Sequence, residues 1–185
     1  MVRLIGISGS LRRGSYNTAL LRAAVTLAPE GTELVAATIH GIPVYDADLE
    51  AESGIPDPVR ILKDQVAAAD GLILFTPDYN NSVPGPFKNA IDWMTRPASD
   101  ISRVFGDKPV AVLGASPGNF GTVLSQDAWL SVLRTLKTRP WFGGRLLVSR
   151  ANTVFDENGQ LTDDKVRERL RNFVQGFSDF AKQSR

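Results

Sequence analysis

The chain has 185 residues, of which 43% are hydrophobic, and this size and composition fit one globular domain with a substantial core. Its 21 basic and 20 acidic residues give a formal net charge of +1, which excludes the broad positive surface of a nucleic-acid-binding protein and leaves room only for local anion sites. The absence of cysteine excludes disulfides, thiolate metal sites and dithiol redox chemistry, so any electrons must be carried by something other than protein sulfur.

The opening segment "MVRLIGISGS" turns to glycine and serine too soon for a signal peptide, and no apolar run approaches the length of a membrane span. We therefore expect a cytoplasmic protein that does not act at a membrane. The acidic stretch 43–58 is expected to be a long loop, and it is too short to separate two domains. A single domain over residues 1–185 is the resulting prediction.

Short apolar runs alternate with longer segments of helical periodicity along the whole chain. In chain order the pattern predicts a strand at 3–8, a helix at 15–28, a strand at 33–38, a helix at 57–69, a strand at 71–76, a helix at 84–94, a strand at 109–115, a helix at 122–138, a strand at 145–149 and a helix at 162–182. Thr162 is the expected cap of the last helix, with Asp163 and Asp164 in its first turn.

This alternation is typical of an α/β fold with a parallel sheet and crossover helices. Five such units fit a flavodoxin-like, five-stranded doubly wound sheet of order 2-1-3-4-5, with helices on both faces. In sheets of this kind ligands bind at the carboxyl ends of the strands. The loops after the first, third and fourth strands are therefore expected to form the site.

The first of these loops, "GISGSLRRGSYN", gathers hydroxyl groups, backbone N–H groups and guanidinium groups at the start of a helix. Such a set, at the positive end of a helix dipole, suits a phosphate dianion, and Ser10, Arg12, Ser15 and Asn17 are the predicted contacts. The alternative is a serine-capped helix after a glycine turn, with solvated arginines. The loop does not match the G-x-G-x-x-G fingerprint, which argues against a classical NAD-binding domain.

The second loop, "FTPDYNNSVPGPFKNAIDW", carries prolines close to asparagines, a tyrosine and a serine. Prolines stiffen the backbone, so carbonyl and N–H groups here could be held facing a planar polar ligand, with Tyr79 adding an aromatic surface. The alternative is an ordinary proline-rich turn in which Pro84 starts the helix and Asn80 or Ser82 caps it. This loop alone does not decide between the two.

The third loop, "LGASPGNFGTV", again places small residues after a strand, and small residues let the backbone approach a flat ring closely. By itself it also fits a plain turn between a strand and a helix. Three such loops at one edge of a sheet favour a shared ligand site.

With these residues in view, the chain resembles the NADPH-dependent FMN reductase family. This flavodoxin-like group includes bacterial chromate and quinone reductases and azoreductase-type enzymes. "GSLRRGSYN" is similar to the phosphate loop of the family, and "TPDYNNSVPGPFKNAIDW" is similar to its flavin-ring loop. Asp78 stands where the family usually has glutamate, which leaves the contribution of that side chain open.

The resemblance implies a bound FMN and NADPH or NADH as co-substrate. The cofactor-binding residues that it implies are Ser10, Arg12, Ser15, Tyr16 and Asn17 at the phosphate, Pro77, Asp78, Tyr79 and Asn80 at the ring, and Ser116 and Gly118 in the third loop. The flavin would carry the chemistry, so no side chain is predicted to be catalytic and no metal is expected.

The expected reaction is a two-electron, ping-pong transfer from NAD(P)H to a small acceptor. Quinones, chromate, azo compounds and free flavin or ferric complexes are the classes that the resemblance suggests. The alternatives are a flavodoxin-like electron carrier and an FMN-binding module without turnover. The near-neutral charge argues against the carrier, which would need an acidic docking face.

Several further residues have weaker predictions. Arg96 is a speculative contact for an anionic substrate or the nicotinamide phosphate, against a simple helix-end cation or an interface ion pair. His40, the only histidine, is given no role. Phe120, Trp129, Trp141 and Phe142 suit a core or a subunit interface better than a roof over the site. The resemblance implies a homodimer or homotetramer with FMN near the interface.

Overall fold

A parallel sheet in the order β2-β1-β3-β4-β5 runs through the molecule, the order that the sequence predicts. The computed structural model describes residues 1–183. The strands are β1 (Val2–Ser8), β2 (Thr32–Thr38), β3 (Gly71–Phe75), β4 (Pro109–Ala115), β5 (Arg139–Pro140) and β6 (Leu147–Val148). The ladders are in register across the centre, where Ile5 lies opposite both Val35 of β2 and Leu72 of β3.

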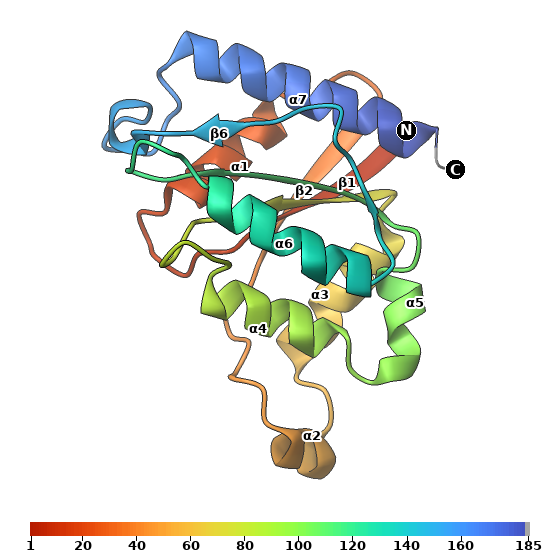
Figure 1. Ribbon diagram of the computed structural model, residues 1–185. Coiled ribbons are helices and arrows are strands. Elements are labelled where there is room, and N and C mark those ends of the chain that lie inside the picture. Colours follow the sequence, from red (N-terminus) through yellow and green to blue (C-terminus); the bar gives the residue numbers. More distant parts are fainter. Residues whose placement is uncertain (184–185) are drawn as a thin grey trace.

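Helices cover both faces of this sheet (Figure 1). They are α1 (Tyr16–Thr26), α2 (Ala47–Ser53), α3 (Asp57–Ala68), α4 (Gly85–Met94), α5 (Ile101–Val104), α6 (Val123–Thr135) and α7 (Asp164–Lys182), with short 3-10 turns η1 (Ala98–Asp100) and η2 (Ala151–Thr153). One core lies between the sheet and α1 with α7, and the other between the sheet and α3, α4 and α6. Side chains alternate between these cores along a strand, with Leu4 in the first and Ile5 and Ile7 in the second.

The fifth strand differs from the prediction of one strand at 145–149. Two short strands share this position: β5 pairs with the start of β4, and β6 pairs with its end. Between them the chain bends around the ring of Trp141, which packs edge-on against Phe173 of α7 with 5.0 Å between centroids. Gly143 and Gly144 allow this bend, since a Cβ on either would come within 2.5 or 2.7 Å of the Trp141 ring.

The expected acidic loop at 43–58 contains α2, which the sequence analysis did not predict. Asp46 caps this helix by accepting a hydrogen bond from the backbone N–H of Asp48 at 2.9 Å. The helix has no buried residue, so it lacks the apolar periodicity by which the other helices were found. It projects from the body of the molecule below α3 and α4 (Figure 1).

The caps of two helices also differ from expectation. Asp163, rather than Thr162, caps α7 by accepting from the N–H of Val166 at 2.9 Å, while the Thr162 hydroxyl donates to the carbonyl of Val154. Pro84 precedes α4 without a side-chain cap, so neither Asn80 nor Ser82 has that role. Both corrections are local and leave the sheet unchanged.

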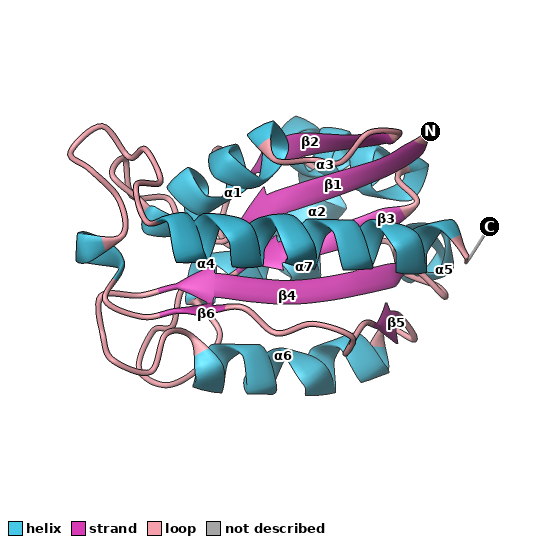
Figure 2. Ribbon diagram, turned by 90° about the horizontal axis from the view of Figure 1, so that it is seen from above, coloured by secondary structure: helices cyan, strands magenta, loops and turns pink. Residues whose placement is uncertain are grey.

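The strands all point the same way, so the sheet has one carboxyl edge. The loops after β1, β3 and β4 lie at that edge, whereas β1 begins and α7 ends at the opposite one (Figure 2). None of the helices within residues 1–183 combines the length and the apolar character needed to cross a membrane.

Candidate active site

The loops after β1, β3 and β4 enclose a cavity of about 480 Å³, within the size range of small-molecule sites. Its lining is drawn from all three loops: Ser10, Arg12, Ser15, Tyr16, Asn17, Pro77, Asp78, Tyr79, Ala115, Ser116 and Pro117. Asn80 and Gly118 line a neighbouring cavity of about 530 Å³, which also has Asp78 and Ser116 in its wall. The structure therefore brings together the side chains that the sequence placed on separate loops.

The first loop presents donors toward the cavity at the start of α1. Ser15 is the N-cap of this helix, and its Oγ accepts from the N–H of Thr18 at 3.2 Å. Ser10 Oγ accepts from the N–H of Arg12 at 3.3 Å, so the hydroxyl hydrogens of both serines are free to turn to a ligand. The first N–H groups of α1 have no partner within the helix and add to the positive end of its dipole.

The side chain of Arg12 is exposed and also lies at the start of α1. Its Nη2 donates to the carbonyl of Gly14 at 2.6 Å, and its guanidinium lies 5.2 Å from the centre of the Tyr16 ring. Serine capping, which the sequence presented as the alternative to anion binding, thus leaves these donors available at the loop. The donor set of hydroxyls, N–H groups and one guanidinium matches the phosphate of the FMN that the family resemblance implies.

Asn17 has a different task from the predicted phosphate contact. Its side chain is buried, donates from Nδ2 to the carbonyl of Ala115 at 2.9 Å and accepts at Oδ1 from the N–H of Ala115 at 2.9 Å. Both polar ends of the amide are used in this way, so its backbone N–H is the group that Asn17 has left for a phosphate. The side chain instead holds the end of β4 against the start of α1.

The second loop ends in a tight hairpin. The backbones of Tyr79 and Ser82 exchange two hydrogen bonds of 3.2 Å, and Asn80 and Asn81 between them have φ values of 53° and 63°. Two consecutive residues with positive φ are typical of a type I′ turn, which asparagine tolerates well. The two asparagines thus shape the loop, and both line the neighbouring cavity.

Asp78 connects the second loop to α6. Its Oδ2 accepts from the N–H of Ser125, in the first turn of that helix, at 3.3 Å. Beneath it the indole Nε1 of Trp129 donates to Thr76 Oγ1 at 3.0 Å, and Thr76 also lies within hydrogen-bonding distance of Ser125 and of the Pro77 carbonyl. This buried network fixes the strand end from which the loop departs, and the shorter acidic side chain of Asp78 suits the contact with α6.

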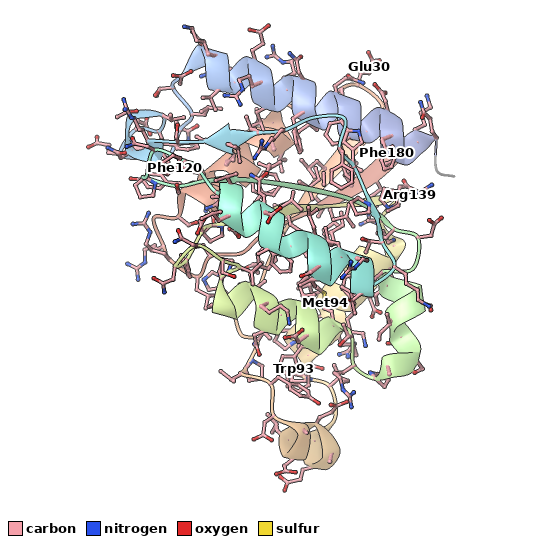
Figure 3. All side chains as sticks on the ribbon, viewed as in Figure 1. Glu30, Trp93, Met94, Phe120, Arg139 and Phe180 are labelled. Carbon is pink, nitrogen blue, oxygen red and sulfur yellow. The ribbon has the colours of Figure 1, made fainter. Side chains whose placement is uncertain are left out.

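The third loop is supported from behind by segments that the sequence analysis did not connect with it. The N–H of Ser116 donates to Val148 of β6, and the carbonyls of Ser116 and Gly118 accept from Ala151 and Arg150, each at 3.0 Å. The Ser116 hydroxyl donates to the carbonyl of Gly121. A Cβ on Gly118 would meet nothing closer than 3.8 Å, so this glycine keeps one wall of the cavity open. Phe120 follows at the rim, where 81% of it is exposed (Figure 3).

Arg96, the speculative substrate contact, lines neither cavity. Its Nε donates to Glu50 of α2 at 2.8 Å, and the Tyr45 hydroxyl donates to the same carboxylate at 2.9 Å. The hydrogen bond from Arg96 holds the pKa of Glu50 below its ordinary value, and that of Arg96 is raised in turn by Glu50. This ion pair was not expected, because α2, which carries Glu50, was not predicted, and a contact of Arg96 with a substrate stays a prediction.

His40, which was given no role, lies beside the first loop. Its Nδ1 is 2.6 Å from Thr38 Oγ1 and its Nε2 is 3.3 Å from the carbonyl of Leu11. It therefore braces the loop that carries Ser10 and Arg12 against the end of β2. Within residues 1–183 no group of three or more histidine, cysteine, aspartate or glutamate side chains is placed to hold a metal ion.

Comparisons with known proteins agree with this geometry. The family model described as NADPH-dependent FMN reductase matches residues 2–153. An NAD(P)H-dependent FMN reductase of Pseudomonas aeruginosa is 43% identical over 174 residues, which are 94% of this chain and 92% of the relative. A 2-hydroxy-1,4-benzoquinone reductase of Burkholderia is 33% identical over 100% of this chain and 98% of its own.

A solved structure extends the similarity to three dimensions. The flavoenzyme NAD(P)H:(acceptor) oxidoreductase of Paracoccus denitrificans superposes with a TM-score of 0.86 at 33% identity, over 99% of this chain and 98% of its own. The likeness therefore covers the sheet, both helical layers and the ligand loops.

Proposed function

Since the chain belongs to the NADPH-dependent FMN reductase family, we propose that it is a flavoenzyme that reduces quinones with NAD(P)H. One observation supports this most directly: a phosphate-type donor set and a rigid, backbone-lined loop share one cavity at the carboxyl edge of the sheet. The net reaction converts NAD(P)H, a proton and a quinone into NAD(P)⁺ and a hydroquinone.

When bound, FMN supplies the redox chemistry, because its ring accepts a hydride and gives up two electrons to an acceptor. The protein has to bind and orient it. Ser10, Arg12, Ser15 and the first N–H groups of α1, those of Tyr16 and Asn17 among them, would hold the phosphate. Residues 77–80 and the third loop at Ser116 and Gly118 would hold the ring, largely through backbone groups.

The second cavity, between Asn80 and Phe120, opens beside the ring loops, and the nicotinamide and the acceptor would enter it in turn. Alternate occupation of that space would give ping-pong kinetics. Several relatives are named quinone reductases, which supports quinones as acceptors; chromate, azo compounds and free flavin or ferric complexes belong to the same proposal.

We also propose that the chain forms a homodimer or homotetramer with the flavin near the interface. Phe120 and Leu124 line the second cavity and are exposed apolar side chains. Covering them with a second copy would remove apolar surface from water next to the ring site. Light scattering would measure how many chains the assembly contains. Cell fractionation would test the expected cytoplasmic location.

An anaerobic spectroscopic titration tests the function. The purified protein should show a flavin spectrum, or acquire one with FMN, and NADPH or NADH should bleach it rapidly. Addition of a quinone should restore the colour with one quinone consumed per nicotinamide oxidised. A protein that takes up no FMN would contradict the proposal. Bound flavin that resists both nicotinamides but accepts electrons from a protein donor would favour an electron carrier, and flavin that is never reduced would favour a binding module.

A further inference from the structure

A second groove lies on the outer side of the first loop, away from the ring residues. Its volume is about 490 Å³, and it shares Arg12, Ser15 and Tyr16 with the cavity described above. The two spaces therefore border the same residues, which are those proposed to hold the FMN phosphate. A ligand whose phosphate sits there could extend from one into the other.

The inner wall of this groove is positively charged. Arg13 and Arg22, which come from the loop and from α1, are exposed and line it together with Arg12. Neither Arg13 nor Arg22 has an ion pair among residues 1–183, whereas Arg60, Arg96 and Arg103 are each paired with a carboxylate. Two guanidinium groups beside the phosphate loop are thus free for an anion that the FMN phosphate site does not account for.

The outer wall is preformed by the segment before α7. Phe155 is buried and stacks on Tyr16, with 5.9 Å between ring centroids. The Asp156 carboxylate accepts hydrogen bonds from the N–H groups of Asn158 and Gln160 at 2.9 and 2.7 Å. It therefore already has hydrogen-bond partners within its own turn. The Glu157 carboxylate also lines the outer wall, so the groove has an aromatic base, carboxylates on its outer wall and free cations on the inner one.

We propose that this groove is a subsite for an adenosine phosphate group. The inference rests on the proposed function, because both dinucleotides of flavoenzyme chemistry contain such a group. In FAD a second phosphate and an adenosine are joined to the phosphate of FMN, and from the shared residues they would enter the groove beside Arg13 and Arg22. The adenosine phosphate of NAD(P)H is the other source of the same chemistry.

The test compares FAD with FMN on flavin-free protein. Dissociation constants are measured by flavin fluorescence for the wild type, for the double variant Arg13→Ala/Arg22→Ala, and for Arg134→Ala. Arg134 is an exposed arginine in the last turn of α6 and controls for the loss of positive charge. The double variant should bind FAD about tenfold or more weakly, the scale of one lost charge-assisted contact, and should bind FMN within about twofold of the wild type.

A second arm separates the two sources. KM for NADPH and for NADH is measured on the FMN-loaded double variant and on the control. A raised KM with unchanged FAD affinity assigns the groove to the nicotinamide dinucleotide, and weaker FAD binding with unchanged KM assigns it to FAD. If neither quantity changes, or if FMN weakens as much as FAD, the subsite does not exist as proposed. A wild-type protein that binds neither flavin contradicts the proposed function instead.

Discussion

Asn17 and Ala115 lie 98 positions apart in the chain, yet two hydrogen bonds of 2.9 Å join them at the carboxyl edge of the sheet. Asn17 was predicted as a phosphate contact, and that role stays a prediction for its backbone N–H, because its side chain is used in the two bonds to Ala115. A sequence shows that a polar side chain follows a strand; it does not show which backbone group on another strand will satisfy it.

Replacement of Asn17 by alanine should destabilise the fold by about 2–4 kcal/mol, because it leaves the buried N–H and carbonyl of Ala115 without partners. Denaturant unfolding of the flavin-free protein measures this. Asn152→Ala, at an exposed position in η2, is the matched control and should change the free energy of unfolding by less than about 0.5 kcal/mol. Equal effects of the two variants would show that the contact with Ala115 is not important for stability.

Arg12 was predicted as a phosphate ligand. Its side chain lines the cavity, so that role remains the prediction to be tested. Arg12→Ala should weaken FMN binding by about 1.5–3 kcal/mol, or roughly tenfold to a hundredfold in the dissociation constant. Riboflavin lacks the phosphate, so its affinity should be the same for wild type and variant. A parallel loss for riboflavin would mean that Arg12 shapes the loop rather than binding the phosphate.

Among the elements, the five helices with an apolar stripe and the first four strands were predicted to within a few residues. The failures have a common cause. α2 has no buried face, β5 and β6 are too short to show a period, and η2 is a single turn. Each of them is fixed by contacts with distant segments, and these contacts leave no local pattern in the sequence.

The arm that carries α2 is held by charge and hydrogen bonds, and this makes it sensitive to acid. Arg96 and Tyr45 both donate to Glu50, and Arg96 lowers the pKa of that carboxyl from its ordinary 4.5. Stability that arises from a lowered acid pKa is complete above the ordinary value and is lost as the pH falls through the lowered one. The arm should therefore be fixed at neutral pH and loosen as the pH falls below the ordinary value of 4.5 and through the lowered pKa of Glu50.

Hydrogen exchange of residues 43–58 as a function of pH, corrected for the intrinsic rate, measures this loosening. In the wild type, protection should decrease as the solution is acidified below that range. Glu50→Gln removes one of the titrating groups and should give weaker protection that depends less on pH there, since the Asp46 cap still titrates. Protection that stays constant in the wild type would contradict a role for this ion pair.

At the scale of the whole molecule, the order of the strands determines which loops lie together at the candidate site. The correct sheet order, predicted from the alternation of strands and helices, was enough to place the loops after β1, β3 and β4 side by side. It could not show the supporting contacts from β6 and η2, or the groove formed with the segment before α7. Those depend on how the last third of the chain returns to the sheet after the break at Trp141.

The candidate site is formed by loops that follow three different strands. FMN bound there should therefore raise the free energy of unfolding of the whole protein. At a free concentration of 100 times its dissociation constant, the gain is about 2.7 kcal/mol, which corresponds to a rise in Tm of about 5–10 °C for a chain of this size. Calorimetry of the flavin-free protein with added FMN measures it. Riboflavin at the same concentration should give a smaller rise, and no rise with FMN would contradict the shared site.

The orientation of the sheet has a practical consequence. β1 begins and α7 ends at the edge opposite the ligand loops (Figure 2), so tethers placed next to Val2 and Lys182 would both leave that edge. A protein attached to an electrode or a bead through either tether would present the cavity to the solution, where nicotinamide and dissolved acceptors could reach it.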